Sequence, residues 1–312
     1  MVKNSRIVFL NRIDFPRILP VATAGSRARV LKEWYLSRAG QCAYQQHRYQ
    51  STTSTTQIRI WYRLLYFNTR GAAEPIRYLM ALYNVPYQDV RYPIQAAAKG
   101  FGVDETYLKH QAEGRFRANL NKVPILQIVQ QRKEQPDEDG DSGSTDSTQE
   151  VILDEIGQTH TILRFLDYQH GHHASLNPLQ RAHIDSFVEA IRDVKTAWYK
   201  SKTNQKSNEF VSSNLPEWCE KLEHSLPVNE SNSDHPWLIG GHPSLADICL
   251  YALLSAPTSI ITGASQSFFD GAPPGVIRQA YEACPRINDS VTAMSQETAV
   301  QQWEERRPDT FN

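Results

Sequence analysis

The chain has 312 residues, of which 40% are hydrophobic and 21% are charged, and its formal net charge is −1. This composition is that of a soluble globular protein of about two domains. The balanced charge excludes a global field that would recruit nucleic acid or an anionic membrane. No apolar run approaches the roughly 18 residues of a membrane-spanning helix. We therefore expect neither nucleic acid nor a membrane as a partner.

The four cysteines are scattered along the sequence, at Cys42, Cys219, Cys249 and Cys284. They form no C-x-x-C pair and have no metal-binding spacing. Their arrangement predicts a reducing compartment and no structural metal site.

Residues 1–57 differ from the rest of the chain because they carry nine lysines and arginines against only Asp14 and Glu33 as acids. Serine and threonine are frequent, and the segment ends in the run Ser51–Thr56. A basic, serine-rich and acid-poor segment is typical of an organelle transit peptide. We expect it to direct mitochondrial import, with a plastid address as one alternative. The other alternative is a disordered basic extension of a cytoplasmic protein.

The folded part is predicted to begin at Ile58. Residues 58–66 alternate and are rich in β-branched and aromatic side chains, which predicts a strand. Apolar residues at helical spacing predict a helix over Ala73–Asn84, and Glu74 and Pro75 suit its first turn. A second short strand is expected at Asp89–Tyr92.

Residues 93–121 are polar and are expected to be mostly helical or irregular. Two more strands are predicted at Pro124–Val129 and Val151–Leu153. Between them, residues 130–149 form a low-complexity acidic segment that cannot bury apolar area, so we expect a disordered insert inside a β-hairpin. A calcium loop is the alternative for this segment, although calcium needs fixed oxygen ligands.

A helix is predicted over Gly157–Gln169, followed by a linker over residues 170–178 that contains three histidines. These histidines suggest a metal site, but a glycine-containing linker holds side chains poorly in fixed geometry, and we expect no metal. The remainder, residues 177–312, is predicted to be helical throughout.

Two later helices can be located by their apolar residues. An apolar stripe from Ile184 to Trp198 predicts one face of a long helix, which serves as core or dimer surface. A second helix is expected over Phe210–Leu226, with Trp218 and Leu222 facing inward. Ser244 and Asp247 form a capping box at the start of another helix.

Four segments, in this order along the chain, resemble motifs of one family: Leu65–Arg77, Asn121–Leu126, Gly157–Leu166 and Trp237–Asp247. Together they resemble the tyrosine-type soluble glutathione transferases, and they are similar to the sigma, alpha and mu classes. The resemblance covers about Ile58 to Pro308. It implies an α/β thioredoxin-like N-terminal domain over residues 58–170 that binds glutathione. An all-α C-terminal domain over residues 177–312 would then supply most of the second-substrate pocket.

The resemblance implies that Tyr66 is the catalytic residue. A free thiol has a pKa of about 8.5, so only a few per cent of it is nucleophilic thiolate at neutral pH. A tyrosine with a pKa near 10 stays protonated and can donate a hydrogen bond to sulfur. The helix that begins near Glu74 would add the favourable field of its N-terminus.

The other motifs imply contacts to glutathione. Val123 precedes Pro124 in what resembles a cis-proline turn, which would expose the backbone of Val123 for pairing with the peptide. An ordinary trans proline at the start of a strand is the alternative. Gln158 and Thr159 stand where the family has Gln-Ser at a helix N-terminus, a place suited to the γ-glutamyl carboxylate. A plain helix cap is the alternative for this pair.

Further contacts are less sharply defined. Asp193 matches an acid that is often lent across the dimer to the γ-glutamyl amine, although a solvated helix face explains it as well. Lys122, or else Lys109, would meet the glycyl carboxylate, and Arg70 is expected beside the sulfur. Several relatives carry an arginine where this chain has Ala72. Its absence puts the degree of thiolate activation in doubt.

We therefore predict a glutathione transferase that conjugates the glutathione thiolate to an electrophilic, largely apolar substrate. It would work as a homodimer, with glutathione as co-substrate and no other cofactor. Glutathione-dependent peroxide reduction or isomerisation remains open, because it uses the same thiolate. A non-catalytic, ligandin-like binding protein on the same fold is the alternative from another class.

Overall fold

The computed structural model describes residues 57–97, 100–133, 148–228, 234–258, 263–269 and 271–308. The predicted targeting segment, apart from its last residue, lies outside the described residues, as does most of the predicted acidic insert. None of the helices in the described ranges is long and apolar enough to cross a membrane.

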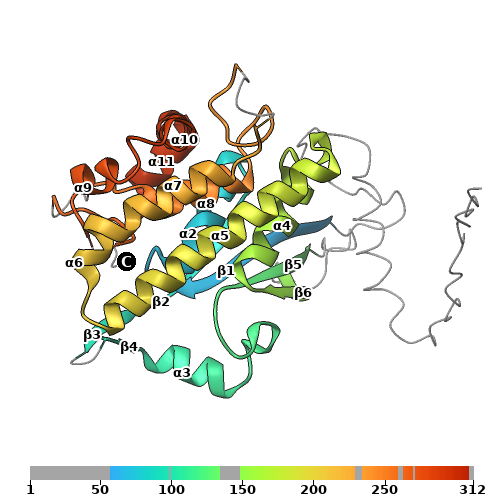
Figure 1. Cartoon of the computed structure of the whole chain (residues 1–312). Helices are drawn as coiled ribbons and strands as arrows, with labels where there is room; N and C mark the ends of the chain where they lie inside the picture. The colour runs from blue at the N-terminus through green and yellow to red at the C-terminus, as the bar shows by residue number, and fades with distance from the viewer. Residues whose placement is uncertain are drawn as a thin grey trace, which may run out of the picture. The chain divides into compact units, whose positions relative to one another are not determined.

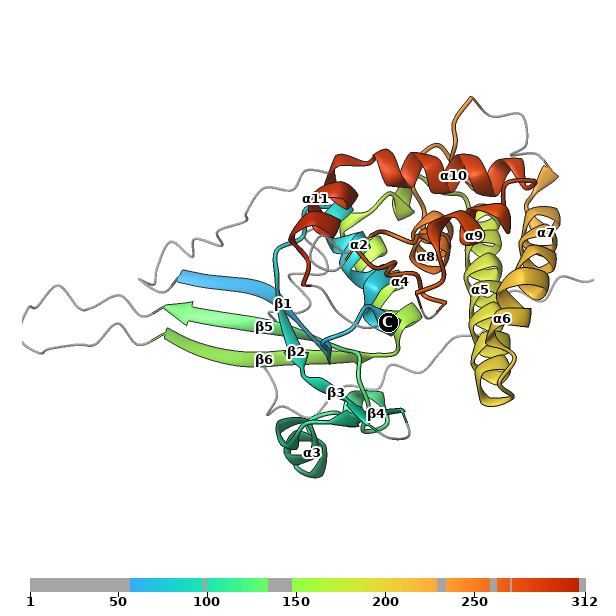
Figure 2. The ribbon, with the colours of Figure 1, turned by 90° about the vertical axis from the view of Figure 1, so that its left-hand side faces the viewer.

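A four-stranded mixed sheet forms the first part of the fold. Its strands are β1 (Gln57–Phe67), β2 (Tyr87–Tyr92), β5 (Ile125–Lys133) and β6 (Thr148–Gly157). The order is β2-β1-β5-β6, with β1 parallel to β2 and antiparallel to β5, and with β5 antiparallel to β6. All four predicted strands are confirmed, and they lie side by side in Figure 2.

The last two strands are longer than predicted. The polar segment was expected to begin at residue 130, but β5 continues to Lys133 and β6 already starts at Thr148. The two strands pair with each other along this extension, Lys133 opposite Thr148. Ladder hydrogen bonds satisfy the backbone there without requiring apolar side chains, which is why composition alone placed the boundary wrongly.

Two helices, α2 (Glu74–Leu82) and α4 (Thr159–His170), pack together and lie between the sheet and the long helix α5 (Pro178–Thr203) (Figure 2). Their inward residues, including Ile76, Leu79, Ile162 and Leu163, are fully buried. The sheet with these helices is the expected thioredoxin-like arrangement.

The segment between β2 and β5 contains more structure than predicted. Two short strands, β3 (Ile94–Ala97) and β4 (Gly100–Val103), pair antiparallel before α3 (Glu105–Ala112) and the 3-10 turn η2 (Arg117–Asn119). The expectation of helical or irregular structure therefore missed the strand pair, because four-residue strands carry too little alternation to stand out. A cluster of buried residues attaches this segment to the sheet: Leu65, Tyr92, Tyr107, Phe116 and Ile125.

The second part of the fold is helical, as expected (Figure 1). After α5 come α6 (Ser207–Glu209), η4 (Phe210–Asn214), α7 (Leu215–Ser225), α8 (Leu245–Leu254), α9 (Pro274–Gln279), α10 (Pro285–Gln296) and α11 (Thr298–Arg306). The apolar stripe of α5 from Ile184 to Trp198 is buried, as core. Trp218 is only half-buried, whereas its neighbour Cys219 is fully buried.

The predicted capping box opens α8. The Ser244 hydroxyl accepts a hydrogen bond from the Ala246 N–H at 3.2 Å, and the Asp247 carboxylate accepts one from the Ser244 N–H at 2.9 Å. Asp247 also accepts from the Leu238 N–H and from the Ser290 hydroxyl. This carboxylate therefore joins the start of α8 to the preceding loop and to α10.

A buried carboxylate, Glu74, connects the start of α2 to the C-terminal helix. Glu74 is 2% exposed and lies 2.7 Å from Arg307, 3.4 Å from Arg77 and 3.7 Å from Arg70. The Trp303 indole N–H, on α11, also donates to it at 3.1 Å. Burial alone would raise the pKa of Glu74, but the arginine charges outweigh it and lower this pKa to about 2. The carboxylate is thus ionised and its charge is compensated inside the protein.

We expect Glu74→Gln to lower the free energy of unfolding near neutral pH by roughly 3 kcal/mol, because about 1.4 kcal/mol accompanies each unit of pKa depression. A depressed carboxyl pKa stabilises the fold fully above the unfolded value of 4.5, and this contribution is lost as the pH falls toward 2. The stability gap between wild type and variant, measured by urea unfolding, should therefore close over that range. The exposed Glu217→Gln serves as the control with no such gap. A gap that stays constant with pH would contradict the assignment.

Candidate functional site

Tyr66 lies next to the end of β1, and the turn that follows brings a backbone donor to its phenol. The Tyr66 hydroxyl accepts a hydrogen bond from the Ala72 N–H at 2.9 Å, and the residue is only 9% exposed. Burial raises the pKa of Tyr66, since it disfavours the charged phenolate. The Ala72 amide and the charge of Arg77 oppose this effect only in part. The phenol therefore stays protonated, and because its oxygen accepts from Ala72, its own proton is available for donation.

Gly71 makes this close approach possible. Its φ of +40° lies in the left-handed region, which residues with a Cβ rarely adopt. A Cβ at this position would lie 2.6 Å from the Tyr66 hydroxyl oxygen. The glycine thus allows the turn to fold directly over the phenol.

The same residue, Ala72, connects Tyr66 to the start of α4. The Ala72 carbonyl accepts a hydrogen bond from the Thr159 hydroxyl at 3.1 Å. Thr159 is the first residue of α4, and the preceding Gln158 has a φ of 67°. The first N–H groups of a helix have no intrahelical acceptor and favour an anion. The backbone of Ala72 thereby places a phenol and a helix N-terminus on either side of one turn.

The Val123–Pro124 peptide bond is cis, as the sequence led us to expect. A buried asparagine connects this turn to Gln158: the Asn119 amide donates to the Pro124 carbonyl at 3.0 Å, and the Gln158 amide donates to Asn119 at 2.6 Å. Asn119 is 5% exposed. The sequence analysis did not find Asn119, because a polar residue in a turn gives no sign that it will be buried. The structure thus brings Val123, Pro124, Gln158 and Thr159 into one region with Tyr66.

Arg70 is placed differently from the prediction, and the roles of Lys122 and Asp193 stay predictions. Arg70 is 3% exposed, and its guanidinium donates to the Gln266 carbonyl and to the Ser255 hydroxyl in the helical part. It therefore holds the turn after Tyr66 against the helical part. Lys122 and Asp193 are both exposed, and within the part of the chain that the structure describes neither forms an ion pair.

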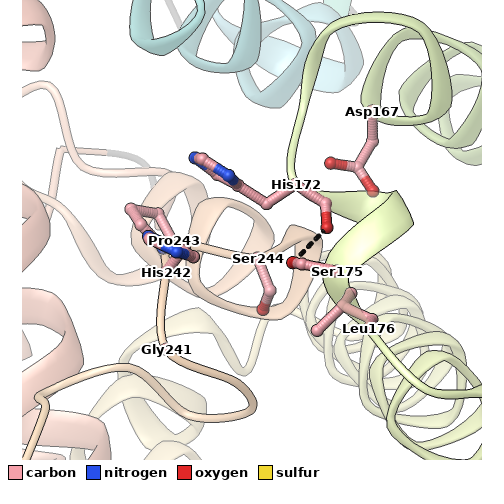
Figure 3. A pocket seen from close by; sticks show the side chains of 8 residues that line it. All are labelled: Asp167, His172, Ser175, Leu176, Gly241, His242, Pro243 and Ser244. Atoms are coloured by element: carbon pink, nitrogen blue, oxygen red, sulfur yellow. Dashed lines mark hydrogen bonds between the residues drawn. The ribbon is translucent and has the colours of Figure 1, made fainter. Parts of the chain in front are cut away.

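The linker histidines each have a different environment. His170 shares a hydrogen bond with the Tyr62 hydroxyl at 2.9 Å, and His173 lies 3.5 Å from the buried carboxylate of Asp167. The His172 ring stacks on His242, with ring centroids 4.1 Å apart. Figure 3 shows these two rings face to face beside a small hollow between the linker and the start of α8. No group of three or more potential metal ligands occurs among the described residues.

Comparison with known proteins identifies relatives of this chain. A family model described as "Glutathione S-transferase, C-terminal domain" matches residues 189–307. Human hematopoietic prostaglandin D synthase is 26% identical over 259 residues, which cover 80% of this chain and 98% of that protein. Glutathione S-transferase 4 of Caenorhabditis elegans is 30% identical over 132 residues, 42% of this chain and 45% of that protein.

Solved structures agree on the fold. The crystal structure of a monomeric glutathione S-transferase from the hookworm Necator americanus has a TM-score of 0.54 at 19% identity. That comparison covers 80% of this chain and 98% of the hookworm chain. The fold comprises a thioredoxin-like domain followed by an all-helical domain, and residues 189–307 match the C-terminal domain of the glutathione S-transferases.

Proposed function

We propose that this protein is a tyrosine-type glutathione transferase in which Tyr66 stabilises the thiolate of bound glutathione. The observation that carries the proposal is the hydrogen bond from the Ala72 N–H to the Tyr66 hydroxyl. That bond uses the phenol as an acceptor and leaves its O–H to donate to sulfur. The phenol keeps its proton because burial raises its pKa, so it acts as a neutral donor and not as a base.

The proposed reaction has two steps. The glutathione thiol releases its proton to solvent, and the Tyr66 O–H together with the nearby helix field favours the resulting thiolate. The sulfur lone pair then forms a bond to an electrophilic carbon of an apolar substrate. In a substitution, the leaving group departs with the electron pair of the bond that breaks. In an addition, the new carbanion takes a proton from water.

Glutathione itself would be held by the groups around the Ala72 peptide. The backbone N–H and C=O of Val123 before the cis proline suit antiparallel pairing with the cysteinyl residue. Gln158, Thr159 and the free amides of α4 suit the γ-glutamyl carboxylate. Lys122, which is exposed beside Val123, would meet the glycyl carboxylate. We assign Arg70 to holding the turn, because its guanidinium is buried against Gln266 and Ser255.

Glutathione-dependent isomerisation is the second candidate, since it would use the same thiolate. The alignment over 98% of a relative named hematopoietic prostaglandin D synthase favours it over peroxide reduction. A ligandin-like protein would bind glutathione without turnover. Conjugation of glutathione to chlorodinitrobenzene, measured beside retention on a glutathione resin, separates the transferase from the other two candidates. Retention without turnover would favour the binding protein or an isomerase.

We expect Tyr66→Phe to lower the rate of conjugation at saturating substrate by about a hundredfold, as expected for loss of one donor to a developing charge. Glutathione affinity should change little, because the variant keeps the ring. Steady-state kinetics with chlorodinitrobenzene give both values. The control is Tyr62→Phe, which removes another phenol from the same strand. The Tyr62 hydroxyl shares a hydrogen bond with His170. Full turnover in Tyr66→Phe would end the assignment.

We also propose a two-fold homodimer in which Asp193 completes the partner's glutathione site. The support is that Asp193 is exposed on α5, and that small homo-oligomers usually have two-fold symmetry. Asp193→Ala should raise the KM for glutathione without changing the mass in solution, measured by light scattering. A fully active monomeric wild type would refute the shared site.

Mitochondrial import by residues 1–57 is a further proposal, supported by their basic and acid-poor composition. A fluorescent reporter fused to this segment should enter mitochondria in cells. The chain beginning at residue 58 should keep conjugation activity. A diffuse cytosolic reporter would count against import, and a plastid signal would favour the other address.

A further inference from the structure

Lys195 on α5 is a cation that has no counter-charge among the described residues. Its Nζ lies 5.2 Å from the ring centroid of Phe268, and its side chain is partly buried. It forms no hydrogen bond or ion pair with any residue in the described ranges. An ammonium withdrawn from water is costly unless it is paired. Burial lowers the pKa of Lys195, and the charge of Arg70 lowers it further.

One loop connects Lys195 to the turn that follows Tyr66. The Arg70 guanidinium donates to the Gln266 carbonyl, so the loop that carries Phe268 is held against the turn after Tyr66. Lys195 packs on that loop through Phe268. Its charge also reaches the start of α4. The pKa of His160 is lowered chiefly by burial, and the charge of Lys195 contributes.

The ring beside this ammonium, Phe268, belongs to an aromatic cluster. Phe268 lies 6.0 Å from Tyr199 and 5.4 Å from Phe269, measured between ring centroids. Phe269 in turn lies 5.3 Å from Trp198. A flat apolar molecule with one negative group would match Lys195 together with the exposed ring of Tyr199, since the ring would cover part of its body and Lys195 its charge. Phe268, which packs against Tyr199, is itself buried.

We propose that Lys195 recognises an anionic group, a carboxylate or a sulfonate, on the second substrate, so that the enzyme prefers electrophiles that are apolar and singly negative. This inference rests on the proposed transferase function, because it concerns the substrate of that same site. A carboxylate at Nζ supplies the counter-charge that the described residues do not. Lys195 is thus a specificity-determining residue, separate from the groups that hold glutathione.

The test is equilibrium binding of two unreactive probes, dinitrobenzoate and dinitrobenzene, to the full chain saturated with glutathione. The probes differ only in the carboxylate, and calorimetry gives both affinities. Wild type should bind dinitrobenzoate more tightly. Lys195→Met should weaken dinitrobenzoate binding by about tenfold, equal to roughly 1.4 kcal/mol, and leave dinitrobenzene unchanged. Lys195→Arg should keep the preference, and Lys200→Met, at an exposed lysine of the same helix, should behave as wild type.

Three results would overturn the proposal. The wild type could show no preference for dinitrobenzoate, Lys195→Met could weaken the binding of both probes equally, or Lys195→Met could weaken the binding of neither. Thermal unfolding checks that the variants are folded. If Lys195→Met does not fold, Lys195→Gln takes its place. Conjugation of chlorodinitrobenzene by the same wild-type sample tests the transferase function separately from the anion site at Lys195. A Lys195-dependent preference without conjugation would refute the transferase function and leave the anion site standing.

Discussion

The site depends on two backbone hydrogen bonds of one residue, Ala72. The Ala72 N–H donates to the Tyr66 hydroxyl, and the Ala72 carbonyl accepts from the Thr159 hydroxyl. One turn thereby holds the phenol of Tyr66 in position. The N-terminus of α4 is bonded to the same turn. Neither bond uses the identity of the side chain at residue 72. An alanine can therefore stand where several relatives have an arginine without breaking the arrangement.

Contacts with the helical part of the protein hold the turn after Tyr66 in place. Arg70 crosses to Gln266 and Ser255, and Glu74 pairs with Arg307 beyond α11. A buried charge is stable only when its partners are in place, so this network couples the position of the turn to the packing of the C-terminal helix. It also brings the loop containing Phe268 to the site, and with it the surroundings of Lys195. The two domains thus build the site jointly.

Local sequence patterns predicted the strands, the α2 helix and the Ser244 capping box, because each depends on neighbouring residues. The cis bond before Pro124 was predicted from the family resemblance. The β3–β4 pair escaped notice since Ile94–Ala97 is too short to show a period. Asn119 and Gln158 are 39 positions apart, and Glu74 and Arg307 are 233 apart. Contacts at such separations come from tertiary packing, which one sequence does not reveal. For the same reason Arg70 was expected beside sulfur and lies instead in the domain boundary.

The most direct test of this account is the pKa of the glutathione thiol in the complex, followed by thiolate absorbance against pH. If the Tyr66 hydroxyl, positioned by Ala72, donates to sulfur, the wild-type midpoint lies well below the value of about 8.5 for a free thiol. The Tyr66→Phe midpoint then returns toward that value while glutathione still binds. A wild-type midpoint equal to that of free glutathione, or the same lowered midpoint in both proteins, would contradict the central role of the phenol.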